Sequence, residues 1–151
     1  MKKAIYPLAA LSLAIASMAL AQTTTTYQAS GGSVSSSMVI TMSLTPSGSA
    51  TLEPSLPSCY LGNTCTFSGS LLRYALPDGS TATIGNFSGT FAPLPGVLNG
   101  YVVKGHASGV DSLGRPVKVK RAIATMTIVG HSGRGGGETK TFTGGLLAVA
   151  N

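Results

Sequence analysis

Apolar and polar residues alternate with a period of two along most of this chain, and no other feature constrains its fold more. In residues 34–45, one parity carries the apolar side chains Val34, Met38, Ile40, Met42 and Leu44, and the other is mostly Ser and Thr. Successive side chains of a strand point to opposite faces, so this pattern predicts a half-buried β-strand over residues 34–45. No segment beyond residue 21 shows a sustained apolar period of 3.6 residues, and we therefore expect an all-β protein.

Turn signals divide the rest of the chain into further strands. Pro77-Asp78-Gly79 combines a Pro suited to the second position of a turn with a Gly that tolerates positive φ. Similar breaks occur at Pro93-Leu94-Pro95-Gly96, at Asp111-Ser112-Leu113-Gly114 and in the Gly-rich segment 131–137. About eight strands are expected, over residues 23–28, 34–45, 49–53, 64–76, 80–91, 97–110, 116–129 and 139–149.

The order of these strands favours an antiparallel meander, because hairpin follows hairpin from residue 64 onward. A meander of this size exposes two sheet edges, and closure into a small barrel removes them most completely. The prediction is thus a closed or nearly closed barrel, with a two-sheet β-sandwich as the alternative. Three strand segments share an aromatic-hydroxyl-glycine pattern, whose Gly permits sharp coiling or close approach of another backbone: Phe67-Ser68-Gly69, Phe87-Ser88-Gly89 and Phe142-Thr143-Gly144.

Residues 1–21 have the three parts of a secretory signal peptide. Lys2 and Lys3 give a positive start, an apolar run follows, and Ala19-Leu20-Ala21 has the small-x-small pattern of a cleavage site. Cleavage there leaves residues 22–151 as a single all-β domain. A retained anchor is the alternative, but the run is short for a bilayer span and no basic stop-transfer residues follow it. We expect a secreted or extracytoplasmic protein, in the periplasm or at the cell surface, that does not span the membrane after cleavage.

Cys59 and Cys65 are the two cysteines of the chain. In an oxidising compartment, two cysteines so close in sequence are expected to form a disulfide. The loop-entropy relation gives about 2 kcal/mol for so short a ring. A redox or zinc pair is the alternative, but such pairs are usually separated by two residues, and no histidine lies near in sequence.

Charge is unevenly distributed beyond residue 21. Residues 22–100 hold only Arg73, Glu53 and Asp78, whereas residues 101–151 hold seven Lys and Arg residues against two acids. The C-terminal third therefore dominates the electrostatic field of the molecule.

Strand parity gathers part of this charge on one surface. Lys104 and His106 share one face of their strand, and Lys118 and Lys120 share one face of the next, opposite Val117, Val119, Ile123, Thr125 and Val129. A register set by the turn at residues 111–114 places Lys118 near Ser108 and Lys120 near His106. The candidate ligand-binding residues are Lys104, His106, Lys118, Lys120 and Arg134. The alternative is an ordinary solvated face, whose lysines discourage pairing between sheet edges.

Side chains suited to catalysis are scarce. His106 and His131 are the two histidines and lie in different predicted elements, while Asp78 and Asp111 occupy turn positions where Asp caps its own backbone. We therefore expect no catalytic residue, no metal and no cofactor. The alternative is a metal- or His-dependent hydrolase, which requires the two histidines within about 5 Å of each other or of an acid.

These observations favour a non-enzymatic secreted or envelope β-domain that acts as a structural or surface binding module. Expected partners are an envelope polysaccharide, a lipid head group or a surface protein. Nucleic acid is not expected, because the basic face is small, lacks interleaved aromatic residues and belongs to an exported protein. The alternative is a carrier that holds an apolar ligand in its lumen, lined by Met38, Ile40, Met42 and Leu44. No particular oligomeric state follows from the sequence.

Overall fold

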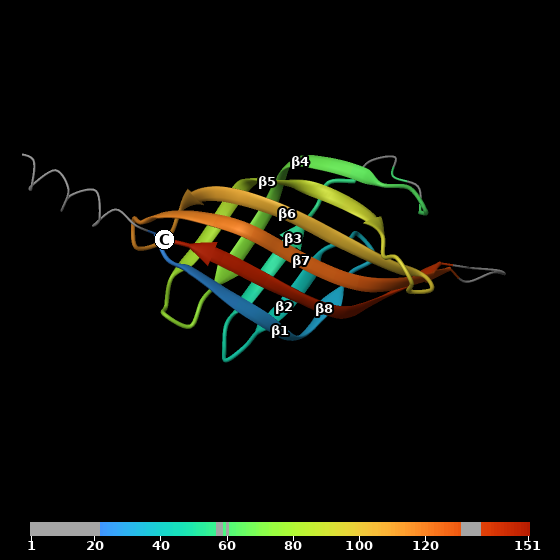
Figure 1. The fold of residues 1–151 in the computed structure, drawn as a ribbon, viewed down its shortest axis with the longest axis horizontal. Helices are drawn as coiled ribbons and strands as arrows, with labels where there is room; N and C mark the ends of the chain where they lie inside the picture. Colours follow the sequence, from blue (N-terminus) through green and yellow to red (C-terminus); the bar gives the residue numbers. More distant parts are fainter. Residues whose placement is uncertain (1–21, 57–58, 60, 131–136) are drawn as a thin grey trace, which may run out of the picture.

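Each strand pairs antiparallel with the next one along the chain, and the last strand pairs with the first, which closes the sheet into a barrel (Figure 1). The computed structural model describes residues 22–56, 59, 61–130 and 137–151. The eight strands are β1 (Thr24–Val34), β2 (Ile40–Leu44), β3 (Ser49–Glu53), β4 (Cys65–Ala75), β5 (Thr81–Pro93), β6 (Gly100–Val110), β7 (Pro116–Gly130) and β8 (Glu138–Ala150). The predicted all-β meander is confirmed, and it forms a barrel and not a sandwich.

Because the strands form a meander, successive connections lie at alternate ends of the barrel. The β2–β3, β4–β5 and β6–β7 turns lie at the end where the chain terminates, on the left in Figure 1. The β1–β2, β3–β4 and β5–β6 connections lie at the opposite end. In the part of the chain that the structure describes, no helix has the length and hydropathy needed to cross a bilayer.

The strand predicted over residues 34–45 is wrong in its first half. Val34 ends β1 and pairs with Ile40 at the start of β2, so residues 35–39 form a tight turn. The Ser35 hydroxyl accepts a hydrogen bond from the Val39 amide at 3.0 Å, and Met38 adopts a positive φ of 65°. The alternation of Ser with apolar residues continued through this turn because Ser side chains also close turns onto the backbone.

Apolar side chains from β2 to β8 meet inside the barrel in one core. Ile40, Met42 and Leu44 are buried there, whereas Met38 packs on its margin and is only partly buried. The largest fully buried side chains include Phe87, Phe91, Leu52, Leu72 and Met126. Tyr74 also points into this core, and among the described residues its hydroxyl is the one buried side-chain oxygen or nitrogen without a hydrogen-bond partner. Burial raises the pKa of Tyr74 to about 12.

The three glycines of the aromatic-hydroxyl-glycine pattern have different roles. Gly69 has a φ of 62° and lies where the β4–β5 register shifts, which is typical of a bulge. Gly89 pairs with Gly105, and a Cβ at Gly89 would overlap the Lys104 carbonyl oxygen and lie 2.6 Å from the Gly105 Cα. Gly144 is the least constrained, since a Cβ there would meet only the Thr125 hydroxyl, at 3.3 Å.

A disulfide joins Cys59 to Cys65 across a sequence separation of 6, as predicted. The disulfide joins a residue between β3 and β4 to the first residue of β4. Disulfides of this kind are typical of oxidising, extracytoplasmic compartments. The predicted signal peptide lies outside the described residues.

Candidate functional site

The outer surface of β6 carries two of the predicted basic residues. Lys104, His106 and Ser108 are exposed, whereas Val103 and Ala107 are buried in the core. This alternation is that of a strand with one face on the core and one in solvent. Ser108 pairs with Lys118 of β7, as the turn register predicted.

A bulge in β7 brings two cations opposite one histidine. Gly105 pairs with Ala122 and Ala107 pairs with Val119, so Lys120 and Arg121 together face the single position of His106. Both residues are exposed. A bulge sets two residues of one strand against one residue of its partner, and here both side chains of the bulge point outward.

Because of the same bulge, the prediction of which β7 side chains point inward is wrong beyond Arg121. Val117 and Val119 point inward as expected, but beyond Arg121 the parity changes. The inward side chains are then Ala122, Ala124, Met126 and Ile128. The outer face carries three residues that were predicted to point inward: Ile123, Thr125 and Val129. Arg121 itself was missed, because unbroken alternation would place it inside. A charged side chain on an apolar face is costly to bury, and this conflict was the one sequence signal for a bulge.

We define the basic face as Lys104, His106, Lys118, Lys120 and Arg121. All of its residues except Lys118 line a shallow hollow of about 230 Å³, and the rest of the lining is Gly89, Gly105 and Ile123. The neighbours on β5 are hydroxyl residues, since Ser88 pairs with His106 and Thr90 with Lys104. On β8, the neighbours of Lys118 and Arg121 are the small residues Ala150 and Ala148. Arg134 and His131 lie outside the described residues.

Each acidic side chain is engaged by a cation outside the basic face. Glu53 pairs with Arg73 at 3.8 Å, and Glu138 pairs with Lys140 at 3.2 Å. Asp78 and Asp111 both pair with Arg115, at 3.3 and 3.0 Å. Within the described residues, the four cations of the basic face therefore have no carboxylate partner.

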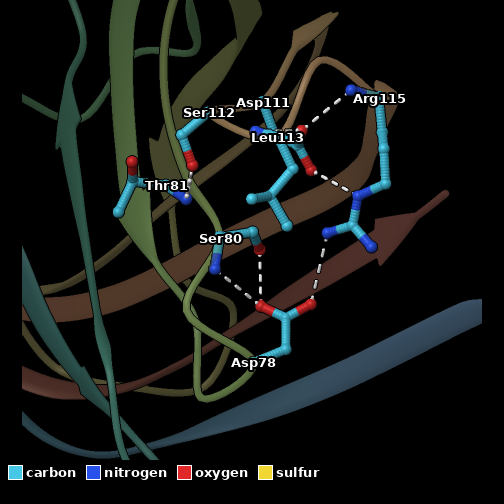
Figure 2. Close-up of polar contacts among 7 residues, drawn as sticks. All are labelled: Asp78, Ser80, Thr81, Asp111, Ser112, Leu113 and Arg115. Carbon is cyan, nitrogen blue, oxygen red and sulfur yellow. Dashed lines mark hydrogen bonds and ion pairs between the residues drawn. The ribbon is translucent and has the colours of Figure 1, made fainter.

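Arg115 and the two aspartates connect two turns at the end of the barrel where the chain terminates (Figure 2). Asp78 accepts hydrogen bonds from the Ser80 amide and hydroxyl, at 2.9 and 2.6 Å. Asp111 accepts bonds from the Leu113 and Arg115 amides, both at 2.9 Å. Each Asp thus caps its own turn, as predicted, and the Arg115 side chain links the β4–β5 turn to the β6–β7 turn.

These hydrogen bonds stabilise the ionised carboxylates. The Ser80 hydroxyl and amide, assisted by Arg115, hold the pKa of Asp78 below its usual value of 3.8. Burial alone would raise the pKa of Asp111, but hydrogen bonds from Arg115 and Leu113 outweigh it and lower that pKa as well. The unfolded chain therefore binds more protons than the folded one around pH 3.8, so both groups favour the folded state above that pH.

We expect Arg115→Met to lower the urea midpoint at pH 7, and the deficit to shrink as the pH falls through the lowered pKa values of the two aspartates. Once both carboxylates are protonated, Arg115 has no anion to pair with. The control is Arg73→Met, which removes an exposed pair and is expected to cost about 0–1 kcal/mol. Urea titrations at neutral and acidic pH, followed by circular dichroism, would measure both variants. An Arg115→Met deficit that stays constant with pH would contradict the interpretation.

No three His, Cys, Asp or Glu side chains gather into a possible metal site within the described ranges. Comparison of the chain with protein-family models, with curated proteins and with solved structures found no match. The exposed cations on β6 and β7 have the chemistry of a surface able to bind anionic groups.

Proposed function

We propose that this protein is a non-enzymatic, exported β-barrel that binds an anionic component of the cell envelope through its basic face. The observation that carries the proposal is the charge imbalance of that face. Four cations lie together on β6 and β7, while the carboxylates of the described residues are all engaged elsewhere. An anionic ligand would supply the counter-charge that the protein itself does not.

The β7 bulge supports a binding role for this face. It adds the guanidinium of Arg121 beside Lys120 and His106, around one hollow. A guanidinium can bind two oxygens of one carboxylate, sulfate or phosphate group, whereas an ammonium acts as a point charge. A solvated face needs only scattered lysines, so the clustering favours a ligand.

The compartment supports an envelope ligand over nucleic acid. The Cys59–Cys65 disulfide is typical of an oxidising environment, and residues 1–21 have the pattern of an export signal. Outside the cytoplasm the abundant anions are polysaccharides and lipid head groups. Both present repeated charges that several cations on one sheet can contact together.

A salt series tests this proposal. We expect the protein to bind dextran sulfate with an affinity that falls as salt rises, because binding a polyanion releases its counterions. The combined substitution Lys104→Gln, Lys120→Gln and Arg121→Gln should weaken binding at least roughly tenfold at low salt. It should also make the negative slope of log K against log salt shallower by about 2, because each of the three lost contacts contributes about 0.7. Titration calorimetry at several salt concentrations would measure both.

A matched comparison uses two variants that each remove a single positive charge. Lys120→Gln should weaken binding, whereas Arg73→Gln, which removes an exposed cation on β4 already paired with Glu53, should not. Equal losses in the two variants would mean that net charge alone drives adsorption, and the basic face would then not be a site. Vesicles containing phosphatidylglycerol, tested in parallel, would show whether a lipid head group replaces the polysaccharide.

A further inference from the structure

A second hollow lies at the end of the barrel opposite the chain terminus, away from the basic face. Its volume is about 310 Å³, at the lower limit of pockets that hold small organic ligands. The lining comes from the β1–β2 turn, the β3–β4 connection, β5 and the start of β8, and comprises Ser36, Ser37, Met38, Pro54, Leu56, Cys59, Leu61, Phe91, Glu138 and Lys140.

One part of this pocket is apolar. Phe91 is almost completely buried in the core, and its ring stacks on that of Tyr101 with a centroid separation of 5.3 Å. Met38 and Leu56 pack against the same core and are partly buried. Met38 does so from the β1–β2 turn, where its backbone has a positive φ of 65°, which is uncommon for a residue other than Gly. Leu61, which also lines the pocket, is 44% exposed.

Lys140 is the polar residue that best fits a ligand. Its side chain is only 11% exposed, and its ammonium pairs with Glu138 at 3.2 Å and donates to the Ser36 carbonyl oxygen at 3.2 Å. An ammonium has three hydrogens to donate. Two acceptors from the described residues therefore leave one donor of a largely buried cation for a ligand acceptor.

Glu138 decides which acceptor is suitable. Its carboxylate lines the same pocket and already neutralises Lys140. A ligand carboxylate would be repelled by Glu138, whereas a cationic head group would be repelled by Lys140. An uncharged carbonyl can accept from Lys140 without either penalty.

We propose that this pocket binds an uncharged single-chain amphiphile, with its acyl chain against Met38, Leu56 and Phe91 and its amide or ester carbonyl accepting a hydrogen bond from Lys140. The proposed ligand site thus lies at one end of the barrel, and not in the lumen where the sequence suggested a carrier site. It uses elements other than those of the basic face, so it stands or fails independently of anion binding.

Methionine methyl groups provide a built-in test of location. Met38 lines the pocket, whereas Met42 and Met126 are fully buried in the core. In protein labelled with ¹³C at the Met methyl groups, titration with N-methyloctanamide should shift the Met38 signal saturably and leave the Met42 and Met126 signals in place. Octanoate and octyltrimethylammonium should bind at least roughly fivefold more weakly, because each places a charge beside a like charge.

Lys140→Met should weaken the binding of N-methyloctanamide at least roughly tenfold, the ratio expected for one hydrogen bond to a charged donor. Arg73→Met removes an equal charge outside the pocket and should change nothing. Shifts at Met42 and Met126 would place the ligand in the lumen and overturn the proposal. Octanoate binding as tightly as the amide, or no saturable shift at Met38 in the wild-type protein, would also overturn it, whatever the stability of the Lys140 variant.

Discussion

Gly89→Ala is expected to destabilise the barrel by about 3 kcal/mol or more, the upper end of the cost of forcing extra atoms into a packed site. The added Cβ would overlap the Lys104 carbonyl oxygen and crowd the Gly105 Cα. These are backbone atoms of the neighbouring strand, so no side chain can rotate away to relieve the clash. Either β5 and β6 separate at this point or their hydrogen-bonded register is lost.

Gly85 provides a matched control on the same strand. A Cβ at Gly85 would meet nothing within 4 Å, and its backbone does not adopt a positive φ. Because Gly in a strand costs about 0.5–1 kcal/mol relative to Ala, Gly85→Ala should leave stability unchanged or raise it slightly. Guanidinium titrations followed by far-ultraviolet circular dichroism would measure both variants. Similar midpoints for the two would show that β5 and β6 are not held in close contact at Gly89.

Phe87→Ala is expected to destabilise the protein by about 3–5 kcal/mol, the usual cost of deleting a fully buried aromatic ring. Phe87 is 0% exposed, and its ring centroid lies 5.0 Å from that of Phe67. It also packs over Gly105, where a Cβ would collide with the ring. Removing the ring therefore opens a cavity bounded by a glycine that cannot fill it.

Phe142→Ala tests whether the effect depends on burial and not on the residue type. Phe142 lies at the margin of the core and is only partly buried, so its loss should cost about half as much as that of Phe87. The same denaturant titrations apply to both variants. If Phe142→Ala proved as damaging as Phe87→Ala, the centre of the packed core would lie elsewhere than near Phe67 and Phe87.

Local chemistry explains why so much of the fold could be predicted. Asp78 and Asp111 form their turns through hydrogen bonds to amides within four residues, so nothing distant is needed to specify them. The predicted strand Ser49–Glu53 matches β3, and the later strands agree within three residues at each end. The Cys59–Cys65 pair likewise depends on a short sequence separation.

The error on β7 arises where neighbouring strands must adjust to each other. The bulge at Lys120 and Arg121 depends on how β7 pairs with both β6 and β8, which shift register at the same place. A period of two read along one strand cannot reveal an extra residue, and every side chain beyond it changes face. The prediction consequently placed Lys104, His106, Lys118 and Lys120 on one exposed face, as observed, but did not include Arg121.

The sequence by itself determined the all-β class, the positions of the turns after β2, the disulfide and the basic C-terminal third. These follow from alternation, turn chemistry and charge, which act over a few residues. Only the tertiary structure decided that the sheet closes, that Arg115 engages both Asp78 and Asp111, and that the basic face has no carboxylate of its own among the described residues. Closure and charge pairing join residues far apart in the chain, and only folding determines which side chains then lie close enough to interact.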